Sequence, residues 1–477
     1  MTPHVVIVGG GVSGLAAARA LRAAVPEAHL TVTVLEASAR VGGKVRTERV
    51  PGADGQGAGD GGGYVLEHGP DLFLTRKPDV AALCGALGLA LEPTTTQPRR
   101  TYVLRQGRLF EMPEGLSGLV PARIGPLLRS PLLSWRGRLR ALAEPLVPAW
   151  RGGDLTVERF LARRMGAEAY NTLVAPLLSG VYGDGAVLST DATVPELRAL
   201  ERRHGSLGRA FWAQRRAAPA APASGGEPAV RGGTAFASVP GGLETLVERL
   251  RADLPGVTVR TGAPVRRIAR DGAGYAVELD AETLRADAVL VALPANAAAP
   301  LLAGLDGDLA APLAAIPHEG VALATLAFAR ADVPHPLDAH GYLVPPNETG
   351  AVRAVTWTTS KFGGRAPEGV ALFRLFFRAP GAVGEADDVL VARASDELAR
   401  TLGARGTLLL TRVSRWPAGL PRYTLGHPAR VAAIEARLAE HAGLFLAGPS
   451  LRGAGLPDAV RQSHAAAHAV LAFLSLP

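Results

Sequence analysis

"VVIVGGGVSGLAAARALRAA", from Val5 to Ala24, is the stretch that decides the fold of this 477-residue chain. It opens with a short apolar, β-branched run and continues with apolar residues at helical spacing, which predicts a buried strand followed by a helix. Between the two, Gly9, Gly11 and Gly14 have the spacing G-x-G-x-x-G. Such glycines permit a tight turn, let the backbone approach a pyrophosphate and let the helix pack closely on the strand. The stretch therefore predicts an α/β, Rossmann-like dinucleotide-binding domain.

A second β-branched run, "LTVTVLEA", begins at Leu30 and leads to Glu36. An acidic residue about 20 positions after the glycine turn accepts hydrogen bonds from ribose hydroxyls in dinucleotide-binding domains. The helix that follows the glycines also offers its positive end to the phosphates. The first cofactor residues are therefore expected to be Gly9, Gly11, Val12, Ser13, Gly14 and Glu36. These residues alone leave open whether the dinucleotide is a nicotinamide or a flavin.

The charge balance argues against a nucleic-acid-binding protein. The chain has 51 Lys and Arg and 43 Asp and Glu residues, a net charge of +8, without long basic runs interleaved with aromatic residues. This mild excess suits anionic small substrates or lipid headgroups better. No run reaches the about 18 apolar residues of a membrane-spanning helix, and the start of the chain reads as a strand rather than a signal segment. A cytoplasmic protein is expected.

Cysteine and histidine patterns favour neither disulfides nor metal. Cys84 is the single cysteine, which excludes an internal disulfide and a multi-cysteine metal site, and its apolar neighbours predict a buried side chain. His464 and His468 stand four residues apart, but the pattern implies no third ligand. A helix face is therefore expected there, and no metal site.

A second glycine loop, in "LEASARVGGKVRT", follows the acidic residue. Its Arg40, Gly42, Gly43 and Lys44 resemble the R-x-G-G-R pattern of the flavin-dependent amine oxidase superfamily, with Lys44 where that family commonly has Arg. The resemblance implies that these four residues contact the same dinucleotide. It also implies that the dinucleotide is a resident FAD, bound non-covalently.

Further motifs resemble the protoporphyrinogen and coproporphyrinogen oxidase family within that superfamily. They are, in chain order, "LLSGVYGDGAVLS" from Leu177, "ERRHGSLGRAF" from Glu201, "RWPAGLPRYTLGH" from Arg415 and "LRGAGLPDAV" from Leu451. The first of them departs from the family pattern by a shift of one residue around Asp184. The segment from Gly341 to Phe377 is similar to the bacterial, Gram-positive-type branch.

The resemblance implies an FAD-dependent, oxygen-using oxidoreductase of haem biosynthesis. Its reaction removes six electrons in three hydride transfers and converts coproporphyrinogen III into coproporphyrin III, with protoporphyrinogen IX as the alternative substrate. Such transfers need orientation and an electron-poor flavin more than a side-chain base, so no catalytic acid or base is assigned. Another enzyme of amine oxidase type and a non-enzymatic tetrapyrrole carrier remain open as alternatives.

The resemblance also places residues outside the two glycine loops. The further cofactor contacts that it implies are Gly69, Pro70, Val265, Ala292, Trp416, Gly448, Gly455 and Leu456. The substrate contacts that it suggests are Asp71, Phe73, Arg76 and Gly180, the last through its carbonyl to pyrrole N–H groups. For the substrate residues and for Trp416, a purely structural role is an open alternative.

Composition and the order of the expected strands and helices divide the chain into an interrupted FAD-binding domain, an antiparallel-sheet substrate domain and a helical domain. The helical domain, rich in Arg, either packs on itself, roofs an apolar cavity or makes weak contact with a membrane surface. The expected segments are the FAD-binding domain (1–75), a substrate-domain segment (76–92), the helical domain (93–211), a flexible linker (212–234), the FAD-binding domain again (235–300), the substrate domain (301–425) and the C-terminal part of the FAD-binding domain (426–477).

Overall fold

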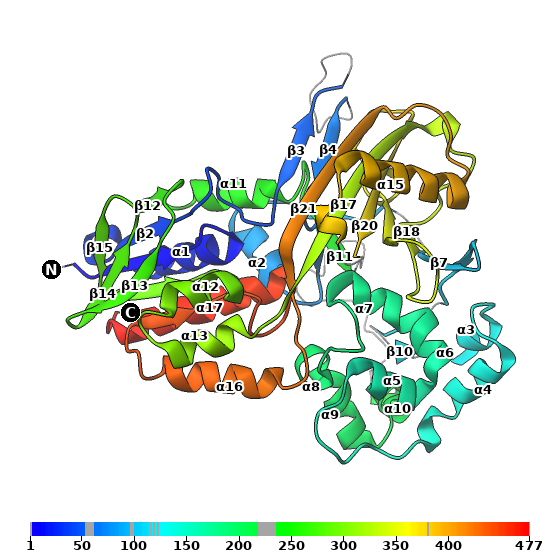
Figure 1. Cartoon of the computed structure of the whole chain (residues 1–477), viewed down its shortest axis with the longest axis horizontal. Helices are drawn as coiled ribbons and strands as arrows, with labels where there is room; N and C mark the ends of the chain where they lie inside the picture. Colours follow the sequence, from blue (N-terminus) through cyan, green and yellow to red (C-terminus); the bar gives the residue numbers. More distant parts are fainter. Residues whose placement is uncertain are drawn as a thin grey trace. The chain divides into compact units, whose positions relative to one another are not determined.

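The structure, a computed structural model, describes residues 2–52, 62–95, 100–113, 116–117, 120–121, 124–217, 235–378 and 381–476. The chain forms two compact units, each assembled from separate stretches of sequence (Figure 1). Unit 1 comprises Met1–Thr94, Gly232–His318 and Pro428–Pro477, and unit 2 comprises Thr95–Arg231 and Glu319–His427.

Unit 1 is built on a five-stranded parallel sheet of order β12-β2-β1-β16-β22. The strands are β1 (His4–Val8), β2 (Thr31–Leu35), β12 (Val257–Arg260), β16 (Ala288–Val291) and β22 (Leu444–Leu446). Strands from the beginning, the middle and the end of the chain thus share one sheet. The interrupted Rossmann-like fold that the glycine stretch predicts is confirmed.

Both faces of this sheet are covered, as is usual for an all-parallel sheet. Side chains alternate along β1, so Val5 and Ile7 belong to one hydrophobic core and Val6 and Val8 to another. The first core includes residues of α1 (Val12–Ala24), α2 (Asp79–Ala86), α11 (Glu244–Ala252) and α17 (Leu456–Phe473). The second includes residues of α12 (Ala295–Leu302), α13 (Gly307–Ala314) and an antiparallel sheet of β13 (Arg267–Asp271), β14 (Gly274–Glu278) and β15 (Thr283–Ala286).

Shorter elements complete unit 1. They are η1 (Glu27–His29), the hairpin of β3 (Thr47–Val50) and β4 (Tyr64–Glu67), a three-stranded sheet of β5 (Phe73–Leu74), β11 (Phe236–Ser238) and β6 (Glu92–Pro93), and α16 (His427–Leu438), whose first residue belongs to unit 2.

Unit 2 contains a seven-stranded, mainly antiparallel sheet of order β21-β17-β20-β19-β18-β7-β8. Its strands are β7 (Tyr102–Arg105), β8 (Arg108–Glu111), β17 (His318–Ala329), β18 (Gly341–Leu343), β19 (Val352–Trp357), β20 (Val370–Phe377) and β21 (Leu410–Pro421). α15 (Asp387–Leu402) covers part of the sheet, because its Leu390, Ala394 and Leu398 lie in the same core as β17 and β20. The antiparallel sheet expected from the sequence is present.

The remainder of unit 2 is mostly helical and has a core of its own, which includes Phe160, Leu173 and Leu188. Its helices are α3 (Ile124–Arg129), α4 (Trp135–Leu142), η2 (Glu144–Leu146), α5 (Val157–Met165), α6 (Ala167–Ala169), the π-helical turn η3 (Tyr170–Val174), α7 (Ala175–Val181), α8 (Thr190–Thr193), α9 (Pro195–His204) and α10 (Leu207–Ala217). Small elements elsewhere in unit 2 are β9 (Leu116–Ser117) paired with β10 (Val120–Pro121), η4 (Arg330–Asp332), α14 (Thr358–Lys361) and η5 (Ala382–Gly384).

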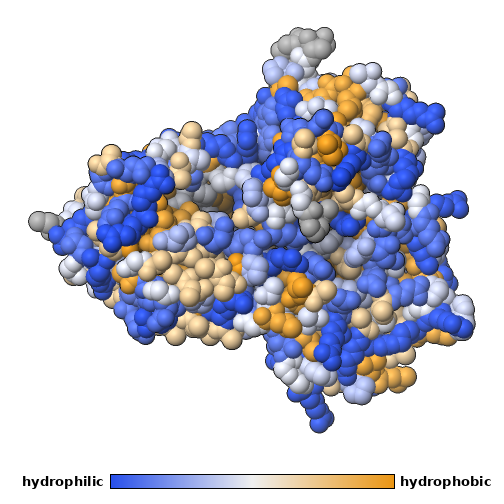
Figure 2. Space-filling model, viewed as in Figure 1, coloured by the Kyte–Doolittle hydropathy of each residue, from blue (hydrophilic) through white to orange (hydrophobic). Residues whose placement is uncertain are grey.

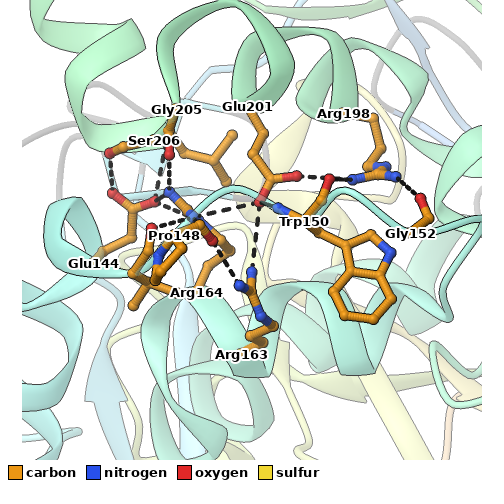
Figure 3. Close-up of polar contacts among 12 residues, drawn as sticks. Glu144, Pro148, Trp150, Gly152, Arg163, Arg164, Arg198, Glu201, Gly205 and Ser206 are labelled. Carbon is orange, nitrogen blue, oxygen red and sulfur yellow. Dashed lines mark hydrogen bonds and ion pairs between the residues drawn. The ribbon is translucent and has the colours of Figure 1, made fainter.

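A buried ion network joins the helices of unit 2 (Figure 3). The fully buried Arg164 donates from Nε to Glu144 Oε1 at 2.6 Å and pairs with Glu201 at 3.4 Å. Glu144 in turn accepts hydrogen bonds from the amides of Leu207 and Gly208, at 3.0 and 2.9 Å, which stabilises the N-terminus of α10. Part of the motif "ERRHGSLGRAF" therefore has a packing role.

The structure differs from the expected segments at four places. Residues 76–92 belong to unit 1, because Val80, Leu83 and Cys84 pack in the core beside α17. Residues 301–318 also belong to unit 1, where α13 packs against α12. Residues 212–217 continue α10, and the rest of the expected linker lies outside the described residues. Residues 102–111 form strands of the unit 2 sheet instead of helices.

The part of the chain that the structure describes contains no helix that is long and apolar enough to cross a membrane. Nor do the described residues include a group of three or more His, Cys, Asp and Glu side chains arranged to hold a metal ion. On the face that Figure 2 shows, hydrophilic residues predominate and apolar residues form separate patches.

Candidate functional site

The first glycine turn in unit 1 has the geometry that only glycines allow. Gly9 has φ +110°, and a Cβ there would lie 2.8 Å from the carbonyl oxygen of Ala292. A Cβ on Gly14 would lie 1.9 Å from the carbonyl oxygen of Gly9, so helix α1 approaches the turn as closely as backbone permits. Val12 and Ser13 form the first turn of α1 after the N-cap Gly11. Their amide groups are at the positive end of the helix, where phosphates bind.

Glu36 is held at the end of β2 by hydrogen bonds to both carboxylate oxygens. Its Oε2 accepts from the Gly10 amide at 2.8 Å. Its Oε1 accepts from the Ser38 amide and hydroxyl at 2.9 and 2.7 Å. Gly10 and Ser38 are not among the residues expected from the sequence, although the position of Ser38 two residues after the acidic residue is typical of a local side chain–backbone turn.

The second glycine loop lies directly against the first. The Gly42 amide donates to the Gly10 carbonyl at 2.8 Å, and Gly11 and Gly42 form an isolated parallel bridge. Gly42 and Gly43 have φ +103° and +58°, and a Cβ on Gly43 would lie 3.3 Å from the Cα of Gly11. The two loops therefore form one cradle lined by backbone, which side chains at these glycines would fill.

Arg40 stabilises its own loop. Its guanidinium donates to the carbonyls of Val41, Gly43 and Val45 at 2.9, 2.6 and 3.1 Å, and pairs with Glu244 at 3.3 Å. Burial lowers its pKa, while Glu244 raises it. The structure thus gives Arg40 a role in shaping the cradle in addition to the cofactor contact expected from the resemblance.

Lys44 follows the two glycines and is half-buried. Burial disfavours its ammonium form and lowers the pKa of Lys44 to about 8. His318, in the same unit, has a lowered pKa through burial and, to a smaller extent, the nearby charge of Lys44. Within hydrogen-bond range of His318 are the Ile316 carbonyl, 3.0 Å from Nδ1, and the Ser450 hydroxyl, 3.4 Å from Nε2.

Several residues expected from the resemblance lie near the glycine turn. The Ala292 amide donates to the Val8 carbonyl at 2.8 Å, which places Ala292 beside Gly9. A Cβ on Gly448, whose φ is +122°, would lie 3.8 Å from Ser13 Oγ. Val265, another expected contact, packs against the hydrophobic core that contains Val6 and Val8 of β1.

Gly455 and Leu456, two further expected cofactor contacts, lie at the N-terminus of α17. Gly455 is the N-cap and Leu456 the first residue of the helix. Asp458, in the first turn, is 3% exposed at its side chain and pairs with Lys77 at 2.7 Å and Arg461 at 2.6 Å. Lys77 and Asp458 are 381 residues apart in the chain, so no local sequence pattern indicates that they pair.

The segment after β4 has mixed surroundings. Gly69, Pro70 and Asp71 are half-buried, and Arg76 is exposed. Phe73 is 2% exposed and lies in the core of unit 1, which favours the structural alternative for this residue over a substrate contact.

Two expected residues belong to unit 2. Trp416 is half-buried on β21, and a Cβ on Gly419 would lie 3.1 Å from its Cβ. Gly180 is exposed near the end of α7, and its carbonyl lies 3.5 Å from Arg378 Nη2.

The cradle fits a dinucleotide. Backbone lines it at Gly9, Gly11, Gly42 and Gly43, a helix begins at it, and a carboxylate anchored at the end of the next strand stands where ribose hydroxyls bind. This arrangement can hold a pyrophosphate through backbone N–H groups.

Comparisons with known proteins agree with this geometry. A model of the family described as flavin containing amine oxidoreductase matches residues 12–471. The coproporphyrinogen III oxidase of Bacillus subtilis is 33% identical over 99% of this chain and 98% of its own length. The enzyme of the same name from Propionibacterium freudenreichii is 32% identical over 98% of this chain and 90% of its own length.

Solved structures show the same fold. A structure described as a candidate protoporphyrinogen oxidase, from an Exiguobacterium species, has a TM-score of 0.83 and 29% identity and covers 100% of this chain and 99% of its own. Cyclohexylamine oxidase from Brevibacterium oxydans, at 16% identity over the full length of both chains, has a TM-score of 0.67 and shares the fold. Because the family match extends from α1 into α17 and includes both units, the chain belongs to the flavin-containing amine oxidoreductase family and uses a flavin cofactor.

Proposed function

We propose that the chain is an FAD-dependent porphyrinogen oxidase that converts coproporphyrinogen III into coproporphyrin III. The observation that carries the proposal is the glycine cradle with its anchored Glu36, in a chain that is similar over nearly its whole length to enzymes named coproporphyrinogen III oxidase. Three two-electron steps, each with the loss of one hydride and one proton, account for the six electrons removed. Three molecules of oxygen accept them and become three molecules of hydrogen peroxide.

FAD is the dinucleotide that we propose for unit 1, held without a covalent bond. In this proposal, backbone groups of Gly11 and Gly43 would hold the dinucleotide, with the carboxylate of Glu36 at the ribose and Lys44 at a phosphate. When bound, the flavin supplies a hydride acceptor. The positive end of α17, at Gly455 and Leu456, would stabilise negative charge on a flavin held there.

Unit 2 is the substrate unit in this proposal. Gly180 presents its carbonyl to pyrrole N–H groups. Asp71 and Arg76, which the resemblance suggests as substrate contacts, remain separate proposals. None of these groups needs to act as a catalytic acid or base, because binding that orients the reacting carbon supplies much of the rate.

Protoporphyrinogen IX is the second candidate substrate. A chloroplastic protoporphyrinogen oxidase of Spinacia oleracea is 29% identical over 98% of this chain and 84% of its own length. The two substrates differ in carboxylates, four in coproporphyrinogen III and two in protoporphyrinogen IX, so kinetics separates them.

The proposed location of the protein is the cytoplasm, with weak peripheral contact with the membrane. Trp135, Leu139 and Leu146, on α4 and η2, are 65%, 57% and 81% exposed, and Arg136 lies over the Trp135 ring. An exposed aromatic residue beside cations suits the headgroup region of an anionic membrane. Salt-sensitive co-sedimentation with anionic vesicles, weakened in Trp135→Ser, would support this contact, and extraction only by detergent would contradict it.

The proposed function is tested by supplying each porphyrinogen to the purified enzyme in air and following porphyrin fluorescence, oxygen and peroxide. Three oxygens consumed per porphyrin, with kcat/KM at least about tenfold higher for coproporphyrinogen III, would support it. The reverse preference would assign the second candidate, and absence of fluorescence with both would refute porphyrinogen oxidation.

A further inference from the structure

Three adjacent strands of unit 2 place charged side chains at one end of the sheet. Glu319 is the second residue of β17, Arg378 directly follows β20, and Arg422 directly follows β21. β17 pairs antiparallel with β20, with Ala322 opposite Phe377, and β21 is its neighbour on the other side. The start of β17 and the end of β20 therefore meet at the same end of the sheet.

The three side chains form a cluster with an excess of positive charge. Arg422 Nε lies 3.8 Å from Glu319 Oε2, within ion-pair range but beyond hydrogen-bond range. Burial lowers the pKa of Arg378, and Glu319 and Arg422 shift it in opposite directions, which places both charges near its guanidinium. One carboxylate thus faces two guanidinium groups, and one positive charge remains uncompensated within the cluster.

Polar atoms of this cluster are buried without hydrogen-bond partners. Among the residues that the structure describes, none forms a hydrogen bond with Arg378 Nη1, Arg422 Nε or Glu319 Oε2. Buried donors without acceptors are costly and uncommon in folded proteins. Two cationic donors that lack an acceptor match an anionic ligand with oxygen atoms, because guanidinium groups bind carboxylates with charge-assisted hydrogen bonds.

The cluster adjoins the loop after α7. Arg378 Nη2 lies 3.5 Å from the carbonyl of Gly180, and a Cβ on Gly183 would lie only 2.6 Å from Glu319 Oε2. Gly183 has φ +101°, so glycine suits this position both in backbone conformation and in space. The cationic cluster therefore lies beside the residue that is proposed to contact pyrrole N–H groups.

We propose that Arg378 and Arg422 form a carboxylate-binding site that holds a propionate of the tetrapyrrole, with Glu319 positioning Arg422. This inference rests on the proposed function, since it assigns a contact of the same substrate. The bound propionate accepts hydrogen bonds from both guanidinium groups and supplies the missing acceptors. Glu319 is a positioning residue and limits the positive charge of the site.

The site is tested with the FAD-loaded, full-length enzyme and two probes of equal ring structure. Coproporphyrin III carries four carboxylates, and its tetramethyl ester carries none. Binding of each is titrated by porphyrin fluorescence, and kcat and KM are measured with coproporphyrinogen III. Arg378→Met and Arg422→Met are each expected to weaken binding of the acid at least about tenfold, raise KM similarly and leave binding of the ester nearly unchanged.

Three further variants separate a carboxylate site from a general loss of structure. Arg108→Met removes an exposed arginine from β8, at the opposite edge of the same sheet, and is expected to change neither titration. Arg378→Lys keeps the positive charge but loses the paired N–H donors of the guanidinium. It is expected to bind coproporphyrin III more tightly than Arg378→Met and less tightly than the wild type. Glu319→Gln keeps a side-chain oxygen that can position Arg422 but removes one negative charge, and is therefore expected to tighten binding of the acid, an effect opposite to that of the arginine variants.

The outcomes distinguish the inference from the proposed function. A wild-type enzyme that oxidises coproporphyrinogen III, with equal affinity for the acid in wild type and both arginine variants, would overturn the site and leave the function standing. Equal losses for acid and ester would also overturn it, because they indicate changed packing. A wild-type enzyme that neither binds coproporphyrin III nor oxidises the porphyrinogen would overturn both.

Discussion

Lys77 Nζ lies 2.7 Å from the carboxylate of Asp458, whose side chain is 3% exposed. The pair joins the segment after β5 to the first turn of α17. A carboxylate in the first turn is favoured by the helix dipole, but a buried charge also needs a cation. Asp458 has a second cation, Arg461, whose side chain is 51% exposed.

Lys77→Met is expected to destabilise the protein by about 1–3 kcal/mol, less than the loss of a fully buried pair because Arg461 remains. Urea denaturation of the FAD-loaded enzyme measures this change. The control is Arg452→Met, which breaks an exposed pair with Glu435 and is expected to cost under about 1 kcal/mol. Equal costs in the two variants would show that burial of Asp458 is unimportant.

Glu36→Ala is expected to lower FAD affinity at least tenfold. The variant removes a charged acceptor for the ribose, worth roughly 1.5–3 kcal/mol, and frees the Gly10 amide and Ser38, which Glu36 now holds. The dissociation constant is measured from the fluorescence of released FAD. Glu27→Ala, at an exposed position of the same unit, serves as the control, and unchanged FAD affinity in Glu36→Ala would remove the ribose assignment.

Gly14→Ala is expected to abolish FAD retention, because its Cβ would lie 1.9 Å from the Gly9 carbonyl oxygen and would push α1 away from the turn. Gly85→Ala is the matched control. Gly85 lies in α2, and a Cβ on it would meet no atom within 4 Å, so alanine there is expected to leave FAD content unchanged and to stabilise the helix slightly. A yellow, FAD-saturated Gly14→Ala protein would refute the close approach.

FAD affinity is expected to depend on pH through Lys44. Burial lowers the pKa of Lys44 to about 8 before the cofactor binds, and only the protonated form attracts a phosphate. Affinity is therefore expected to be full below about pH 8 and to fall as the pH rises above it. An anion bound nearby raises this pKa, so binding takes up a proton in that range.

Equilibrium dialysis of FAD from pH 6.5 to 10 measures this dependence. Lys44→Arg, which keeps its charge throughout, is expected to show a flat profile, and Lys44→Met a flat profile at lower affinity. A wild-type affinity that stays constant up to pH 10 would contradict a phosphate contact at Lys44.

The local geometry of the candidate cofactor site could be predicted from the sequence. The roles of Gly9 and Gly14 depend on the backbone geometry of the turn, and the role of Glu36 depends on its position at the end of a strand. Both features are determined by residues that are close in the sequence. The partners of Arg40 and Asp458 could not be predicted, because Glu244 and Lys77 reach them only through tertiary packing.

The sequence also does not specify that residues 76–92 join unit 1. Val80, Leu83 and Cys84 give an apolar helix, but the sequence does not tell which core it joins, and in the structure it joins the one that contains α17. The cluster of Glu319, Arg378 and Arg422 was missed because three strand ends, each ordinary in sequence, meet only in the folded sheet.

The central claim, that this flavoenzyme takes hydride from a porphyrinogen, is tested most directly by mixing the FAD-loaded enzyme with coproporphyrinogen III in the absence of oxygen. The visible absorbance of the oxidised flavin is followed in a single turnover, and air is then admitted. The account predicts rapid bleaching of the flavin on mixing, followed in air by recovery of its absorbance and the appearance of coproporphyrin fluorescence. A flavin that stays oxidised with coproporphyrinogen III and with protoporphyrinogen IX would contradict it.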